Sequence, residues 1–150
     1  MNIALSLNQI INLSKKDYKV IGIDSYDLKN ILGKHKQWTS YTLQDVNEAK
    51  TWISFGTAGN YFVQWIDISE DEFKKFSNFS LNLDLTGIAN IKFQGNAGYS
   101  SPFAEIINLN VTNQNFDFLG IERFLKKERE ILVPLESYFQ RGLILRDFKP

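Results

Sequence analysis

Regular alternation of apolar and polar residues is the feature that most limits what this chain can fold into. Residues 81–85 read LNLDL, and this pattern is typical of a half-buried strand because successive side chains of a strand point to opposite faces. Segments 18–23 and 38–43 are rich in β-branched and aromatic residues, which favour strands. The pattern therefore predicts a mainly-β fold with many short strands.

Two pairs of strand-like segments flank turn-like residues, and each pair predicts a hairpin. In the first pair, residues 51–55 and 61–66 enclose the sequence GTAGN. Gly and Asn tolerate the positive φ angles that tight turns need. In the second pair, residues 88–93 and 103–111 lie on either side of the sequence GNAG.

Helical patterns are confined to two stretches. Ser69 precedes three acidic residues, an arrangement typical of a helix N-terminus, and Phe73 and Phe76 follow at helical spacing. Residues 121–135 fit either a helix with one apolar stripe or two strands joined at residues 126–129, because periodicity alone does not separate the two. We favour the hairpin there.

These elements predict one domain over residues 1–150, since no linker, low-complexity tract or block of like charge divides the chain. Hydrophobic residues make up 43% of it and aromatic residues 14%, enough to build a firm core. The expected fold is mainly β (α+β), an antiparallel, partly open barrel or sandwich with one or two short helices.

Several kinds of chemistry are excluded by residues that the sequence lacks. There is no cysteine, hence no disulfide, thiolate metal site or cysteine nucleophile, and the only histidine is His35. No glycine-rich phosphate loop and no GxSxG motif occur. Seventeen basic and seventeen acidic residues cancel, so nucleic acid is an improbable partner. We expect no catalytic residue, no metal and no cofactor.

The first residues also bear on location. They lack the basic and long apolar stretches of a signal peptide. No apolar run approaches the roughly 20 residues that a membrane-spanning helix needs. We therefore expect a soluble, cytoplasmic protein without a transmembrane segment.

Three ionisable side chains have both a structural and a functional interpretation. His35 lies in the basic sequence GKHKQ and is either a solvated loop residue or a general base that needs a carboxylate brought in by the fold. Alternation places Glu105 on the same strand face as Phe103 and Ile107, so it either turns outward at a bulge or lines a pocket as a buried carboxylate. Glu122, beside Arg123, is either part of a surface ion pair or a second pocket carboxylate.

The functional interpretation joins these carboxylates to nearby aromatic residues. In it, one cavity binds a small molecule, and a carboxylate serves as an acid or a base. It predicts that Glu105 and Glu122 reach the same cavity. The candidate ligand-binding residues are Glu105, Glu122, Tyr41, Trp52 and Trp65.

Several segments, taken in order, resemble a bacterial family of unknown function, domain of unknown function 4178. The resemblance spans roughly positions 9 to 140, and its weight comes from the order and spacing of short motifs. Ser40 stands where the family usually has an acidic residue, and the family's glycine before the final Glu-Tyr element is absent. The matching segments are 18–22 (YKVIG), 38–43 (WTSYTL), 51–54 (TWIS), 87–91 (GIANI), 121–123 (IER), 130–131 (EI) and 136–138 (ESY).

The resemblance implies a β-rich accessory protein without established enzyme activity. Some members are encoded near small envelope-stress or membrane-associated genes. Our first prediction is therefore a non-enzymatic accessory or scaffolding domain that binds a protein partner, or itself, through a sheet edge or an aromatic patch. The alternative is the small-molecule-binding or hydrolytic domain with a carboxylate-lined pocket.

Overall fold

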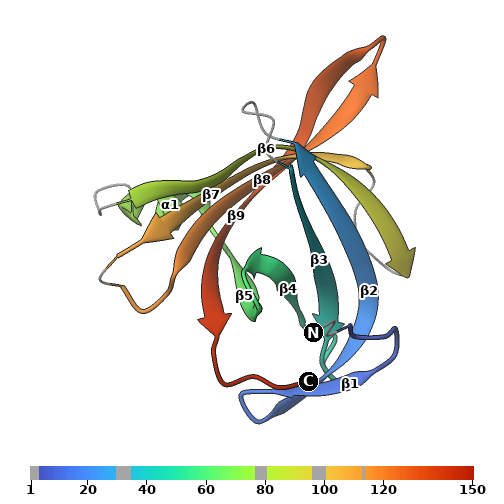
Figure 1. The fold of residues 1–150 in the computed structure, drawn as a ribbon, viewed down its shortest axis with the longest axis vertical. Coiled ribbons are helices and arrows are strands. Elements are labelled where there is room, and N and C mark those ends of the chain that lie inside the picture. The colour runs from blue at the N-terminus through green and yellow to red at the C-terminus, as the bar shows by residue number, and fades with distance from the viewer. Residues whose placement is uncertain (1–3, 30–34, 77–80, 96–100, 113) are drawn as a thin grey trace.

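The computed structural model describes residues 4–29, 35–76, 81–95, 101–112 and 114–150. Within them, nine strands form one antiparallel sheet in the order β1-β2-β3-β4-β5-β9-β8-β7-β6 (Figure 1). The strands are β1 (Ile10–Leu13), β2 (Lys16–Lys29), β3 (His35–Gln44), β4 (Lys50–Ala58), β5 (Tyr61–Ile68), β6 (Leu81–Gly95), β7 (Phe103–Val111), β8 (Phe118–Glu128) and β9 (Ile131–Leu145).

The sheet closes on itself through β2. The first part of β2 pairs with β1, and residues 22–29 pair on the same side with residues 88–95 of β6. Strands β2 to β9 therefore form a closed ring, called the ring below, with β1 added outside it. Register shifts interrupt four of the strand pairs, so the ring is not a regular barrel. The predicted mainly-β, antiparallel fold is confirmed.

The strands of the three predicted hairpins pair as expected, and residues 96–98 of the second predicted turn lie outside the described residues. Strands β4 and β5 meet at residues 59–60, and β6 pairs with β7. Residues 121–135 form the hairpin of β8 and β9 and not a helix. Its turn lies at Arg129 and Glu130, both at positive φ, slightly beyond the expected residues 126–129. The tip of this hairpin projects from the ring (Figure 1).

One short helix, α1 (Glu70–Lys75), is the only helix among the described residues. It begins where the sequence predicts, because the Ser69 side chain accepts a 3.1 Å hydrogen bond from the backbone N–H of Glu72. The Phe73 ring packs on Phe139 of β9, with ring centroids 5.1 Å apart. No helix in the described part of the chain is long and apolar enough to cross a membrane.

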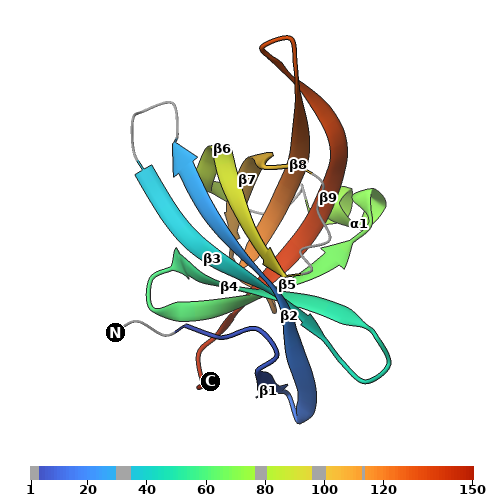
Figure 2. The same cartoon turned by 90° about the vertical axis from the view of Figure 1, so that its right-hand side faces the viewer.

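Strands β2 to β5 are buried on both faces. Their outer face carries an apolar cluster covered by Leu5, by β1 and by Phe148 near the C-terminus. The C-terminus accordingly lies beside β1 in the two ribbon views (Figures 1 and 2). The buried members of this outer cluster are Leu5, Ile11, Leu13, Val20, Tyr41, Leu43, Ile53 and Phe62.

The inner face of the ring carries two further apolar clusters. One joins β2, β3, β6, β7 and β8 and includes Leu28 and Phe124, and the other includes Val63, Trp65 and Phe118. On β8, Phe124 belongs to the first cluster and Phe118 to the second. The stretch between them, which includes Gly120 and Glu122, faces the middle of the interior.

Candidate functional site

A cavity of about 40 Å³ lies in this middle part of the interior. All three tryptophans of the chain line it, together with Tyr26. Most of its other lining residues are polar, although apolar clusters enclose it. These polar residues are Ser40, Ser54, Thr57, Asn108, Glu122 and Gln140.

Strand register explains why these side chains meet. On β3, Tyr41 and Leu43 belong to the outer cluster, so Trp38, Ser40 and Thr42 face inward. Across the strands, Asp24 pairs with Ser40 and Ser40 with Ser54, while Gly22 pairs with Thr42 and Thr42 with Trp52. These two adjacent rows of the inner face, Asp24–Ser40–Ser54 and Gly22–Thr42–Trp52, therefore consist of small or polar residues except for Trp52.

Trp65 is fixed in place by two glycines and a hydroxyl group. A Cβ atom at Gly142 would lie 2.8 Å from Cζ3 of the Trp65 ring, and one at Gly120 would lie 3.1 Å from the same atom. The Trp65 indole Nε1 donates a 2.9 Å hydrogen bond to Ser54 Oγ, which is also 3.0 Å from the Thr57 hydroxyl. The indole therefore lies flat over strands β8 and β9 as one wall of the cavity.

Glu122 supplies a carboxyl group to the cavity wall. It accepts a 2.5 Å hydrogen bond from the Tyr26 hydroxyl, and the Tyr26 ring stacks on Trp38 with centroids 4.9 Å apart. Burial raises the pKa of Glu122 to about 7, although the Tyr26 hydrogen bond lowers it, and the negative charge of Asp67 adds to the rise. This carboxyl group therefore changes charge near neutral pH.

Asp24 is a second interior carboxyl group, and the sequence interpretation missed it. The residue is 0% exposed, and neither carboxylate oxygen has a hydrogen-bond partner among the described residues. Burial, followed by the charge of Glu122, raises the pKa of Asp24 to about 7. Its alternation with Tyr26 and Leu28 on one face of β2 is the sequence signal that could have revealed it.

Two further buried polar atoms lie next to Asp24 in the strand register. Thr42 Oγ1 and Trp52 Nε1 have no hydrogen-bond partner within the described parts of the chain. Buried polar groups in native proteins are nearly always paired, so each exception requires an explanation. Here three of them occur on three neighbouring strands, β2, β3 and β4.

The structure brings three of the five predicted ligand-binding residues together. Glu122, Trp52 and Trp65 all line the cavity. Tyr41 lies on the other face of β3, in the outer cluster, where its hydroxyl accepts a 3.3 Å hydrogen bond from the Leu5 N–H. The predicted meeting of Glu105 and Glu122 at one cavity is wrong.

Glu105 faces outward because the strand face it shares with Phe103 and Ile107 is the outer face of the ring. Its side chain is 38% exposed and lies 3.3 Å from the guanidinium of Arg123. The inner face of β7 carries Ala104 and Ile106 instead, both fully or almost fully buried. No bulge is needed to turn Glu105 outward.

His35 lies at the start of β3, outside the interior. It pairs with Asp27 of β2, and both side chains are about half exposed. The fold thus supplies the carboxylate that a general base would need, but away from the cavity. Among the described residues, no group of three or more His, Cys, Asp or Glu could hold a metal ion.

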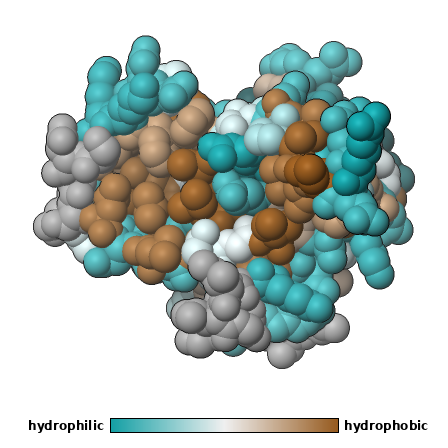
Figure 3. All heavy atoms as spheres, turned by 90° about the horizontal axis from the view of Figure 1, so that it is seen from above, coloured by the Kyte–Doolittle hydropathy of each residue, from teal (hydrophilic) through white to brown (hydrophobic). Residues whose placement is uncertain are grey.

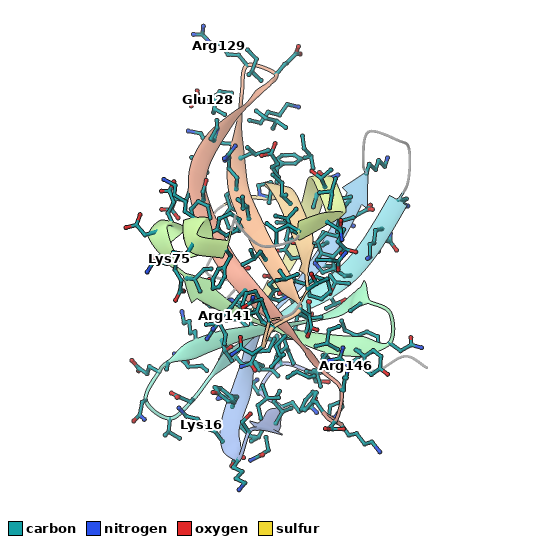
Figure 4. The ribbon with its side chains drawn as sticks, turned by 90° about the vertical axis from the view of Figure 1, so that its left-hand side faces the viewer. Lys16, Lys75, Glu128, Arg129, Arg141 and Arg146 are labelled. Carbon is teal, nitrogen blue, oxygen red and sulfur yellow. The ribbon has the colours of Figure 1, made fainter. Side chains whose placement is uncertain are left out.

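The described lining of the cavity carries one carboxyl group, that of Glu122, and no Lys, Arg or His side chain. Lys16 and Arg129 lie at opposite ends of the molecule (Figure 4). Lys16 pairs there with Asp45 at 2.6 Å. Lys36 of β3 does contact the lining, because its Nζ donates a 2.9 Å hydrogen bond to the backbone oxygen of the lining residue Thr57.

Comparison with known proteins finds no matching family model, no matching curated protein and no matching solved structure. The resemblance to domain of unknown function 4178 stays a prediction.

Proposed function

We propose that this protein binds a small molecule inside the ring and is not an enzyme. The observation that carries the proposal is the convergence of all three tryptophans, Tyr26 and the Glu122 carboxyl group on one interior cavity. Ligand pockets typically combine aromatic walls with a few polar groups that orient the ligand. Closed antiparallel sheets of about eight strands commonly hold one small ligand in this way.

Binding without catalysis fits the arrangement of charged groups. The second carboxylate of the hydrolytic hypothesis, Glu105, lies outside the ring, and His35 lies on the surface. Glu122 is thus the one ionisable side chain among the described lining residues besides the Tyr26 phenol. We place the protein in the cytoplasm, where a chain without cysteine needs no oxidising compartment.

Tryptophan fluorescence can test whether a small molecule binds in this cavity. Compounds of up to about six non-hydrogen atoms are titrated while tryptophan emission and melting temperature are followed. A true ligand gives a saturable change that is lost in Ser40→Leu, which fills the cavity, and is kept in Ser25→Leu, a matched change at an exposed position of β2. A response that both variants keep, or no response from any compound, rejects interior binding.

A protein partner, or a second copy of this chain, is a second candidate ligand. The projecting β8–β9 hairpin exposes Ile131 by 65% and Leu135 by 46%. Seen from above, surface hydrophobic residues form two groups separated by hydrophilic ones (Figure 3). Exposed apolar groups on a protein surface are typical of interaction sites where they form a patch. Closure of the ring, in contrast, removes most of the free sheet edges that we expected to mediate pairing.

Mass measured by light scattering tests this second candidate. The double change Ile131→Ser and Leu135→Ser should convert a self-associating protein to a monomer. Val46→Ser, which alters an 89% exposed residue far from the hairpin in sequence, should not. A wild-type protein that is monomeric at all concentrations and is captured by no partner through this hairpin argues against the second candidate.

A further inference from the structure

We infer that the interior ligand is a small primary ammonium ion, held by the Glu122 carboxylate against the tryptophan walls. The inference rests on the proposed function and specifies the ligand's charge, size and hydrogen-bonding groups. Three properties support it, namely the charge of the cavity, its aromatic lining and the unpaired polar atoms at strand positions beside it.

Charge gives the first argument. Glu122 lies on the cavity wall, and Asp24 lies on the same inner face, beside the lining residues Tyr26 and Ser40. No cationic side chain is among the described lining residues, and Lys36, which donates to the backbone oxygen of the lining residue Thr57, pairs with neither carboxyl group. Ionised groups taken out of water need a partner of opposite charge. A ligand cation supplies that partner, whereas an anion would be repelled.

The aromatic walls favour the same charge. The faces of Trp and Tyr rings attract cations, and the attraction grows when water is excluded. Tyr26 and Trp38 form one stacked wall, with an interplanar angle of 14°. Trp65, held flat by Gly120 and Gly142, forms another. A cation in this cavity therefore meets ring faces as well as carboxylate oxygens.

The unpaired atoms specify a cation that carries hydrogen-bond donors. Both carboxylate oxygens of Asp24 and the Thr42 hydroxyl lack partners among the described residues. Neither residue lines the cavity itself, but Asp24 pairs with the lining residue Ser40 and Thr42 with the lining residue Trp52. A primary ammonium group has three N–H donors, which match the carboxylate and hydroxyl oxygens, whereas the unpaired Trp52 Nε1 is itself a donor and is not satisfied by it. A quaternary ammonium ion has no N–H donors and leaves these oxygens unpaired.

Cavity size sets the length of the ligand. One water-sized group requires about 10–15 Å³ of such volume, and the cavity offers about 40 Å³. The ligand therefore has about three or four non-hydrogen atoms. A ligand of this size rarely binds more tightly than about 40 µM, so titrations must extend to millimolar concentrations.

Ligand binding must also depend on pH, because the carboxyl groups hold a cation only when ionised. Burial raises the pKa values of Asp24 and Glu122 to about 7, and binding of a cation lowers them and releases protons. Among the residues that the structure describes, the other titratable groups that act on this pair are Tyr26, Asp67 and Tyr138, and none of these is cationic. Affinity therefore rises as the pH increases through 7.

The test compares ethylamine with ethanol, acetate and tetramethylammonium at constant ionic strength, by tryptophan emission and calorimetry at pH 8 and pH 5.5. Ethylamine, protonated at both pH values, should bind saturably at pH 8 and far more weakly at pH 5.5. Glu122→Gln should weaken it roughly 10- to 100-fold, the effect expected for a lost hydrogen bond to a charged group. The matched surface change Glu105→Gln should leave it unchanged.

The outcomes separate this inference from the proposed function. If ethanol, acetate or tetramethylammonium binds as well as ethylamine, and Ser40→Leu abolishes that binding, interior binding stands and the ammonium inference fails. If ethylamine binds equally to the wild type and to Glu122→Gln, the inference also fails. If no probe binds and Ser40→Leu changes nothing, both fail. Far-ultraviolet circular dichroism confirms that each variant is folded before it is scored.

Discussion

The Tyr26 hydroxyl group donates a 2.5 Å hydrogen bond to Oε1 of Glu122, and this contact spans the interior of the ring. Tyr26 belongs to β2 and Glu122 to β8, two strands separated in the sheet by β6 and β7. The bond therefore ties opposite parts of the ring together and sets the charge state of the cavity wall. Removing this bond should change the pKa of Glu122, and this change can be measured directly.

Tyr26→Phe should raise the pKa of Glu122 above its value of about 7. The hydroxyl donates to the ionised carboxylate and so favours it, while burial of the carboxyl group remains after the change. The stacked ring on Trp38 is kept, and stability should fall by about 1 kcal/mol. Carbon-13 NMR titration of the Glu side chains measures the shift. Tyr61→Phe, at a 48% exposed position, is the control, and equal Glu122 pKa values in both variants would contradict the prediction.

The wild type should lose folding stability as the pH rises, because the native protein holds the Asp24 proton more tightly than the unfolded chain. The Asp24→Asn variant should not show this loss. The pKa of Asp24 is about 7 when folded and 3.8 as a free group. Between these values the unfolded chain releases the proton and the native protein keeps it. The associated stabilisation is thus complete below about pH 4 and is lost by about pH 7, at roughly 1 kcal/mol per pH unit.

Urea unfolding at several pH values measures this effect. The stability of Asp24→Asn relative to wild type should increase from pH 4 to pH 7 and then level off. Asp147→Asn, at an exposed position, should run parallel to wild type. A difference between Asp24→Asn and wild type that does not vary with pH would mean that Asp24 ionises as easily in the folded protein as in the unfolded chain.

Ser54→Ala should destabilise the protein by about 1–3 kcal/mol, since it leaves the buried Trp65 N–H without an acceptor. The indole environment should change at the same time, which shifts the tryptophan emission. Ser25→Ala, on the exposed face of β2, should do neither. Chemical denaturation followed by emission gives both readouts. A Ser54→Ala protein as stable as wild type would show that Trp65 finds another partner.

Strands and hairpins were predictable because their signals are local. Alternation marks residues 81–85, β-branched and aromatic residues mark 18–23 and 38–43, and glycine-rich sequences mark the first two hairpins, whereas β1 was not predicted. Closure of the ring was not predictable, because the pairing of β2 with β6 joins residues about 65 positions apart and has no local pattern.

The site was only partly predictable because the interior of the ring is polar. In a layered protein the more apolar strand face is the buried one, and by this rule Glu105 either lines a pocket or needs a bulge to turn outward. On β7 both faces are apolar, and the inner one carries Ala104, Ile106 and the polar Asn108. Tyr41, predicted to bind the ligand, does not line the cavity for a related reason. It lies on the outer face of β3, which β1 and residues near the chain ends also bury. Trp52, Trp65 and Glu122 were found because aromatic and charged residues within strands mark such sites.

Gly142→Ala should destabilise the protein by roughly 1–3 kcal/mol, the usual cost of overpacking. The new Cβ atom would lie 2.8 Å from Cζ3 of Trp65 and 3.0 Å from Cε3, too close for either group to stay in place. Leu143→Ala, at a 40% exposed neighbouring position, should cost less and leave tryptophan emission unchanged. Unfolding midpoints and emission spectra of the two variants test this prediction. Unaltered emission in Gly142→Ala would show that Trp65 does not rest on this glycine.

A change at the turn of the β8–β9 hairpin should stabilise the protein, in contrast to the destabilising changes above. Arg129 and Glu130 both adopt positive φ, 48° and 69°, a conformation that Asn and Gly adopt at lower cost. The double change Arg129→Asn with Glu130→Gly should raise stability by about 0.5–1 kcal/mol. The control double change, Arg129→Asn with Glu130→Pro, should destabilise the hairpin, because proline fixes φ at about −65°. Thermal unfolding of the two double variants tests the turn, and a stabilising proline would show that the chain reverses elsewhere.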